Sequence, residues 1–488
     1  MTLKSTKKFM RSLLLFLFTT LLFGQSKGTD KHLILPAMVS DNMVLQQSSS
    51  VGVWGWAEKN KEVTISADWN SETVTVKSDA SGKWKIKIKT PIAGGPFSMK
   101  ISTKKEQITL NNVLIGEVWM GSGQSNMEMP MAGYDNEPIN ESNELILSSK
   151  NQQIRLFTVK RKTNETPLYD CEGSWQEASP ETVADFSAVA YNFAKQLNST
   201  LDVPIGIINS SWGGTPVEAW IQSEAIEDEV TLEEQELFNF NISKNKREQD
   251  APAYLFNGMI NPMLNFTLKG VIWYQGESNR NQPRLYSKTF PLMIENWRDL
   301  WKSPNLSFYY VQIAPYGYSK GLNSAYLRES QLETLSKTDN IGMVVTLDIG
   351  EENNIHPAEK QLVGKRLACW ALANDYGIKK VGFSGPKYKS NEIDGDKMTL
   401  KFDFAEKGLS TFGHPLKDFE IAGQDRVFYQ AEAKILRNKT IQVYSQKVKN
   451  PVAVRYAWKN FLVGSLFNTQ KLPASSFRTD DWEDDFNE

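Results

Sequence analysis

The sequence predicts an α/β protein in which a three-layer α/β/α domain is flanked by N- and C-terminal β-sandwich domains. Within residues 113–378, short apolar stretches alternate with helix-period segments, which is typical of a parallel sheet covered by helices on both faces. Within 29–112 and 379–488, apolar and polar residues alternate at period two between turn clusters, which is typical of small antiparallel sandwiches. A chain of 488 residues has room for about three such domains.

Strands are expected in both flanking domains from this alternation. The clearest segments before residue 112 are 51–56, 62–67, 73–77 and 83–89, and those after 378 are 397–402, 433–436, 440–444 and 452–458.

The middle domain is predicted to contain five buried strands and four helices. The strands are expected at 114–120, 203–209, 270–274, 307–313 and 341–347. The helices are expected at 185–197, with Asp185 as N-cap, and at 291–301, 325–335 and 358–372. The charged segment 222–250 is interpreted as a helical excursion or surface insert.

Residues 1–28 have the features of a signal peptide. Four basic residues precede an apolar run at 12–23, which is too short to span a bilayer comfortably. We therefore expect export to the periplasm or the medium, with no membrane attachment after cleavage; an uncleaved anchor is the alternative.

Composition excludes several classes of function. A net charge of −2 gives no electrostatic reason to expect nucleic acid as a partner. Two cysteines, Cys171 and Cys369, and three scattered histidines supply no metal-ligand set, so no metal and no cofactor is expected. The two cysteines are interpreted as buried free thiols, with a disulfide as the alternative.

Ser125 is the candidate nucleophile. It follows the apolar run 114–120 and the flexible G-S-G at 121–123, which places a hydroxyl at the carboxyl edge of the predicted sheet. A serine hydroxyl needs a general base and donors for a developing oxyanion.

His356 is the candidate general base. His32 and His414 lie in the predicted flanking domains, whereas His356 follows the last predicted strand of the middle domain. Pro357 suits the first position of a helix, so the imidazole is expected at a helix N-terminus, whose dipole disfavours the imidazolium.

Two further strand ends offer candidate donors. Gly213 and Gly214 follow the strand expected at 203–209, and glycine lets backbone N–H groups approach a substrate closely. The polar loop Q-G-E-S-N at 275–279 follows the strand expected at 270–274.

Four motifs in this order resemble the sialate O-acetylesterase family, which belongs to the SGNH-type (GDSL-like) hydrolases that include acetylxylan esterases. The motifs are G-Q-S-N-M at 123–127, G-G-T-x-x-E-A-W at 213–220, W-Y-Q-G-E-S-N at 273–279 and I-H-P at 355–357. The resemblance extends from Leu35 to the R-T-D at 478–480. It implies an SGNH-hydrolase-like middle domain and an esterase that acts on O-acetylated glycans, above all sialic acids.

The resemblance also implies roles for individual residues. Ser125 is the nucleophile and His356 the base, with oxyanion donors from the Ser125 N–H and the Gly214 region. The other expected oxyanion or substrate contacts are Gln275, Glu277, Gln124, Asn126 and Arg328; Arg328 would meet a substrate carboxylate or form a surface ion pair.

The residue that orients the imidazole departs from the family pattern. The family usually has an aspartate just before I-H-P, and this chain has Asn353 and Asn354 there. Either amide could orient the ring, Asp348, Glu351 or Glu352 could reach it instead, or the site could work as a Ser–His dyad.

Other functions compete with sialate deacetylation. An acetylxylan or other polysaccharide acetylesterase would use the same residues. A glycosidase would use paired carboxylates drawn from Glu117, Glu128, Glu218 and Glu277, although no spacing selects a pair. A non-catalytic glycan-binding protein on a decayed hydrolase scaffold is the third alternative. A dinucleotide site fails because G-S-G-Q-S-N lacks the third glycine of the fingerprint.

Overall fold

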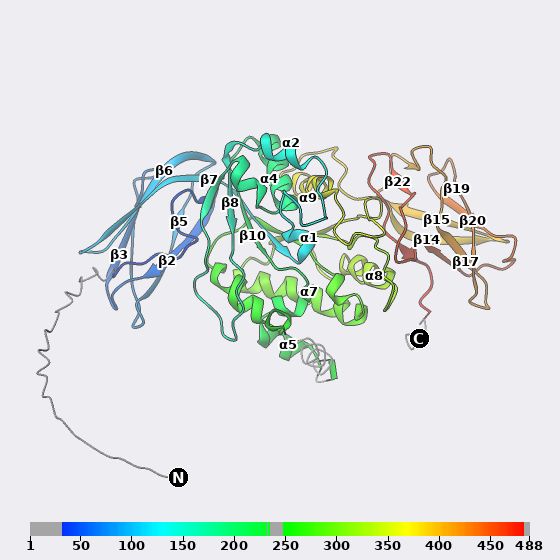
Figure 1. The fold of residues 1–488 in the computed structure, drawn as a ribbon, viewed down its shortest axis with the longest axis horizontal. Helices are drawn as coiled ribbons and strands as arrows, with labels where there is room; N and C mark the ends of the chain where they lie inside the picture. Colours follow the sequence, from blue (N-terminus) through cyan, green and yellow to red (C-terminus); the bar gives the residue numbers. More distant parts are fainter. Residues whose placement is uncertain (1–31, 232, 235–246, 483–488) are drawn as a thin grey trace, which may run out of the picture.

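A computed structural model describes residues 32–231, 233–234 and 247–482. The predicted signal peptide, 1–28, lies outside the described residues, as do residues 232 and 235–246 of the predicted excursion at 222–250. Figure 1 shows a central α/β body between two β-rich ends. Within the described part of the chain, no helix combines the length and apolarity that crossing a bilayer requires.

Seven strands of an 11-stranded sheet form the centre of the molecule, in the order β13-β12-β11-β7-β10-β8-β9. All neighbours along it are parallel except β9, which runs antiparallel to β8. The strands are β7 (Gln107–Gly123), β8 (Asn151–Thr158), β9 (Trp175–Ala178), β10 (Ile205–Ser211), β11 (Gly270–Tyr274), β12 (Ser307–Val311) and β13 (Ile341–Val344).

Helices cover both faces of this sheet (Figure 1). On one face, α4 (Ala188–Leu201) packs against α9 (Lys360–Asn374), and on the other α7 (Pro283–Trp301) packs against α8 (Ala325–Thr334). Each face has its own apolar core, because residues of the buried strands alternate between the two helical layers. The predicted α/β class is confirmed.

The remaining helices of the described residues are short. They are α1 (Ser125–Glu128), α2 (Ser142–Leu147), α3 (Pro180–Ala184), α5 (Ser223–Glu229), η1 (Val217–Trp220), η2 (Glu248–Asp250), η3 (Phe256–Ile260), η4 (Asn261–Met263) and η5 (Glu277–Asn279).

Two helix starts differ from the prediction. The N-cap of α4 is Ser187, whose hydroxyl accepts from the Ala190 N–H, while Asp185 follows α3 as its C-cap. Helix α7 starts eight residues before the predicted 291, with Pro283 in its first turn. Pro291 lies inside α7 and cannot donate to the Ser287 carbonyl, and Lys337 Nζ bonds that carbonyl instead at 2.8 Å.

The first β-rich end continues directly into the central sheet. Strand β7 pairs with β6 and β1 through its first half and with β10 and β11 through its second. The predicted domain boundary at 112/113 therefore falls inside one strand. The other strands of this end are β1 (Val44–Gln46), β2 (Ser50–Trp56), β3 (Glu62–Ala67), β4 (Thr73–Lys77), β5 (Lys83–Lys89) and β6 (Gly94–Ser102).

The other β-rich end contains three antiparallel sheets, β14-β15-β20-β19, β18-β17-β21-β23 and β16-β22. Their strands are β14 (Lys387–Asp394), β15 (Lys397–Asp403), β16 (Leu409–Ser410), β17 (Phe419–Ala422), β18 (Phe428–Gln430), β19 (Glu432–Ile435), β20 (Ile441–Tyr444), β21 (Ala453–Tyr456), β22 (Phe467–Asn468) and β23 (Phe477–Arg478). Cys171 and Cys369 are both free thiols, as expected, but each is partly exposed rather than buried.

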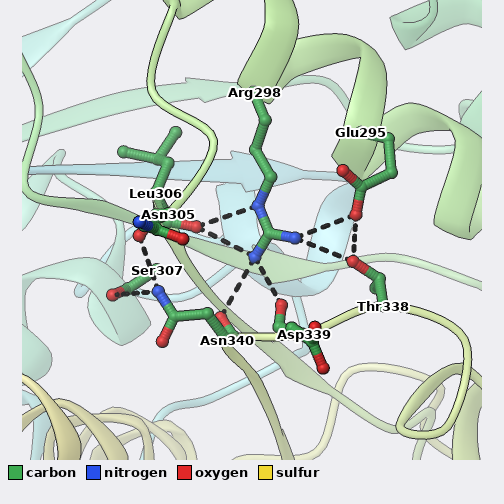
Figure 2. A network of polar contacts seen from close by, with 8 residues as sticks. All are labelled: Glu295, Arg298, Asn305, Leu306, Ser307, Thr338, Asp339 and Asn340. Atoms are coloured by element: carbon green, nitrogen blue, oxygen red, sulfur yellow. Dashed lines mark hydrogen bonds and ion pairs between the residues drawn. The ribbon is translucent and has the colours of Figure 1, made fainter.

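The buried side chain of Arg298 fastens the amino ends of β12 and β13 (Figure 2). It reaches from the last turn of α7 into the two loops that lead into these strands. Its guanidinium donates to the carbonyls of Leu306, Asp339 and Asn340 and to the side chains of Glu295 and Thr338, at 2.7–3.2 Å. The network lies at the edge of the sheet opposite to the carboxyl ends of the strands.

Replacing this guanidinium should lower stability without altering chemistry. Arg298→Met leaves the buried Leu306 carbonyl and the partly buried Asp339 carbonyl without their donor, whereas the Asn340 carbonyl keeps the N–H of Phe308. Each buried unsatisfied group costs about 1–3 kcal/mol. We expect the free energy of unfolding in urea to fall by at least about 2 kcal/mol, with activity at 25 °C retained. As a control, Arg437→Met at an exposed position should change the free energy of unfolding by no more than about 0.5 kcal/mol. An equally small change in Arg298→Met would show that the network around Arg298 contributes little to stability.

Candidate active site

Ser125 stands at the end of the central strand of the sheet. Strand β7 ends at Gly123, which pairs with Ser211 of β10 and Tyr274 of β11, and Ser125 is the first residue of α1. Gly123 has φ +135°, and a Cβ there would lie 2.2 Å from the Tyr274 carbonyl oxygen, so only glycine fits this strand end. The loops that follow β10 and β11 consequently border the serine on both sides.

Three side chains form a chain of hydrogen bonds at this edge. The Ser125 Oγ lies 2.8 Å from Nε2 of His356, and Nδ1 of His356 lies 2.7 Å from Oε2 of Glu137. A carboxylate at Nδ1 favours the tautomer that has its proton on Nδ1, which leaves Nε2 free to accept from the serine hydroxyl.

The environment of His356 keeps its ring neutral. Burial lowers the pKa of His356 below its usual 6.5, whereas the hydrogen bond and charge of Glu137 raise it and the charge of Lys360 lowers it. The ring of Tyr134 packs edge-on against the imidazole at 5.6 Å. Contrary to the expectation from Pro357, α9 begins only at Lys360, so desolvation rather than a helix dipole disfavours the imidazolium.

The structure assigns the expected orienting residues to other contacts. Asn354 Oδ1 accepts the backbone N–H of His356 at 2.9 Å, and Asp348 forms a two-pronged ion pair with Arg366. Asn353 is exposed.

The sequence reasoning missed Glu137, which belongs to a tight turn closed by backbone bonds between Tyr134 and Glu137. It lies 219 positions from His356 and matches no motif in the family resemblance, so only the folded chain reveals the pairing.

The turn after β10 packs directly on Ser125. A Cβ on Gly213 would lie 3.2 Å from both the Ser125 Cβ and Oε2 of Glu128, so a side chain there would crowd the serine. The Gly213 N–H donates to Oε2 of Glu128 at 2.8 Å, which leaves the Gly214 and Ser125 amides as the nearby candidate donors. Ser125 begins α1, and the first N–H groups of a helix have no intrahelical acceptor.

Three residues expected to contact substrate are buried and engaged internally. Both Nε2 protons of Gln275 point at acceptors, the Thr215 carbonyl and Asn279 Oδ1. Gln124 Oε1 accepts from the backbone of Gly276 and Ser278. Gln275, Gln124 and Asn126 are 0%, 3% and 1% exposed, so their amides hold the loops of the site together rather than face a substrate.

Asn126 contacts another of the expected residues, Glu277. Its Nδ2 donates to Glu277 Oε1 at 2.7 Å, and burial raises the pKa of the Glu277 carboxyl. The second oxygen of that carboxyl is buried without a hydrogen-bond partner. Glu277 therefore lies behind Asn126 as a poorly solvated carboxyl.

Arg328 occupies neither of its expected positions. Its side chain is fully buried and donates to the hydroxyls of Ser324 and Ser476 and to the carbonyls of Ala457 and Lys459. It connects α8 to the C-terminal β-rich end and cannot reach a substrate.

Two carboxylates of the alternative glycosidase set are likewise buried in structural bonds. Glu117 accepts from Gln46, Gln47 and Tyr376, and Glu218 accepts from Asn279 and Thr289. In the described part of the chain, no three His, Cys, Asp or Glu side chains are grouped so as to hold a metal ion.

Comparison with known proteins agrees with this architecture. A family model described as carbohydrate esterase, sialic acid-specific acetylesterase, matches residues 115–373. The sialate O-acetylesterase of Rattus norvegicus is 29% identical over 89% of this chain and 91% of its own length. The human enzyme of the same name is 30% identical over 76% of each chain. The crystal structure of a carbohydrate acetylesterase from Xanthomonas citri superposes with a TM-score of 0.84 and 35% identity, over 92% of this chain and all of that one.

The fold, the arrangement at the sheet edge and these matches place the protein among the carboxylic ester hydrolases. Within that class, the chain belongs to the carbohydrate esterase family of sialic acid-specific acetylesterases.

The protonation of His356 can be measured directly. Because burial lowers its pKa, we expect its imidazole to titrate below pH 6.5 in a ¹H–¹⁵N NMR experiment, and to be mostly neutral at pH 7. Glu137→Gln removes a carboxylate that favours the imidazolium, so the midpoint should move to still lower pH. His32→Gln and His414→Gln assign the signal. An upward shift in Glu137→Gln would contradict the contact.

Proposed function

We propose that the protein is an exported carbohydrate O-acetylesterase that removes O-acetyl groups from sialic acids, with Ser125 as nucleophile, His356 as base and Glu137 as the orienting carboxylate. The observation that carries the proposal is the continuous contact from the Ser125 hydroxyl through the imidazole to Glu137, at 2.8 and 2.7 Å.

The reaction has two stages. His356 Nε2 takes the hydroxyl proton as Ser125 Oγ attacks the acetyl carbonyl. The same nitrogen gives the proton to the departing sugar oxygen, which leaves as a hydroxyl and an acetyl-enzyme remains. Water, deprotonated by the neutral imidazole, then attacks the acetyl carbonyl; the bond to Ser125 Oγ breaks, the imidazolium returns its proton to this oxygen, and acetate is released. Glu137 stabilises the imidazolium in both stages through Nδ1.

The oxyanion would be stabilised by backbone donors. The Ser125 N–H at the start of α1 and the Gly214 N–H on the facing turn are the donors we assign. Preorganised donors of this kind are worth roughly a hundred- to a thousandfold in rate.

Cationic groups beside this turn support a substrate that carries a carboxylate, as sialic acids do. Arg161 binds Oε1 of Glu128 at 2.6 Å and lies over the ring of Trp212, and half of its side chain is exposed. Arg247 forms a two-pronged ion pair with Asp250 at 2.8 and 2.9 Å, donates to the Gly214 carbonyl at 3.0 Å and is about half exposed (47%). Of the two guanidinium groups, Arg161 is therefore the one we assign to a substrate carboxylate. A guanidinium can hold a carboxylate through paired N–H donors, and the Trp212 ring can stack on a sugar face.

An acetylxylan or other polysaccharide acetylesterase uses the same catalytic groups and is the alternative. Neutral acetylated xylo-oligosaccharides present no carboxylate to Arg161. The ratio of kcat/KM values for acetylated sialic acid and acetylated xylo-oligosaccharide therefore decides between the two substrate classes.

Removing the hydroxyl tests the enzymatic assignment. Ser125→Ala should lower the release of acetate from 9-O-acetylated N-acetylneuraminic acid by at least about a thousandfold, because no acetyl-enzyme can form. Ser199→Ala, which removes an exposed hydroxyl of α4, should behave as wild type. Retained activity in Ser125→Ala would contradict the proposed mechanism. Binding without turnover in the wild type would favour a non-catalytic glycan-binding protein.

The identity of the orienting group is tested by a pair of substitutions. Glu137→Gln should reduce kcat on the order of a hundred- to ten-thousandfold, since an amide cannot stabilise the imidazolium. Asn354→Asp restores the family's aspartate but should stay within about threefold of wild type, because that side chain bonds the His356 backbone and not its ring. The reverse pattern in steady-state kinetics would assign the orienting role to position 354.

A further inference from the structure

A fully buried lysine lies next to the segment that bears His356. Lys360, the first residue of α9, is 1% exposed. Its Nζ donates to Asn126 Oδ1 at 2.6 Å and to the Pro357 carbonyl at 2.8 Å. An ammonium group removed from water is costly unless it is well paired, so a lysine here needs a reason beyond starting a helix.

The contacts of this lysine connect the two segments that meet in the active site. Asn126 directly follows Ser125, and its Nδ2 donates to the carbonyl of Ile355 at 3.1 Å. Lys360 holds the carbonyl of Pro357. The residues on both sides of His356 are thus bonded to one pair of side chains, and one of that pair adjoins the nucleophile.

We propose that Lys360 and Asn126 are a positioning pair that keeps the His356 imidazole in register with the Ser125 hydroxyl, an inference that rests on the proposed function. Neither side chain touches the reacting atoms. They act through the backbone at 355 and 357, and an error of about 1 Å in such a geometry can cost on the order of a hundredfold in rate.

The pair also has an electrostatic effect on the base. The charged groups that face Lys360 are Glu277, Glu351 and Glu137, and the ring of Tyr274 lies 5.9 Å from its Nζ. Burial outweighs their attraction and lowers the pKa of Lys360 to about 7. Below that pH the lysine carries its charge.

This charge acts on His356 together with Glu137, which has the opposite effect. The Lys360 ammonium disfavours the nearby imidazolium and so lowers the pKa of His356. Removing the ammonium should raise the pKa of the ring, and the acid limb of activity should then move to higher pH.

The proposal is tested by the kinetics of Lys360→Met. This substitution retains much of the length of the side chain without its charge. We expect kcat for acetate release to fall ten- to a hundredfold with KM within about threefold, and the acid limb of kcat/KM to shift to higher pH. Lys360→Arg, which keeps charge and donors, should recover part of kcat and the wild-type acid limb. Lys365→Met, an exposed lysine on the same helix, should match wild type in both readouts.

A double-mutant cycle with Asn126→Ala tests whether the two residues act as a unit. If Lys360→Met does not fold, Asn126→Ala alone tests the positioning role. We expect kcat of the double variant to be no lower than kcat of the more impaired of the two single variants. Additive losses, or a Lys360→Met variant with lowered Tm but wild-type kcat and acid limb, would overturn the proposal. If Lys360 variants are neutral while Ser125→Ala is inactive, only the positioning role fails; if Ser125→Ala is active, the proposed function fails.

Discussion

The register of β7 between β10 and β11 is the constraint on which the site depends. Because Gly123 is paired with Ser211 on one side and Tyr274 on the other, three chain segments leave the sheet at the same level. Those segments carry Ser125, the Gly213–Gly214 turn and the loop 275–279. A slip of one residue would turn alternate side chains of β7 to the wrong face and carry the serine away from the imidazole.

Polar residues around this edge divide into a small reacting set and a larger supporting set. Gln124, Asn126 and Gln275 are as buried as core side chains, and each forms hydrogen bonds inside the protein. Their bonds run between loops, so they replace the apolar packing that a loop-built site lacks. The motifs that single out the family therefore record the framework of the site as much as its chemistry.

The sequence was informative wherever the signal is local or periodic. The period-two and apolar segments predicted strands close to those observed, and 270–274 coincides with β11. The start of α7 was missed because Pro291 reads as a helix start, and the compensating Lys337–Ser287 bond is a tertiary contact. Glu137 could not be found because a carboxylate in a turn has no periodic signature. Arg328 was misjudged because its carbonyl partners come from the C-terminal end of the chain.

The passage of β7 from the first β-rich end into the central sheet has a mechanical consequence. The strand that ends beside Ser125 also pairs with β6 in its first half. The first β-rich end and the central sheet are therefore connected through one continuous strand, without a flexible linker. Movement of the first β-rich end as an independent module would have to bend this strand. A chain shortened to begin at residue 113 would lose the first six residues of β7 and, with them, most of the pairing between β7 and β6 that holds the strand ending beside Ser125.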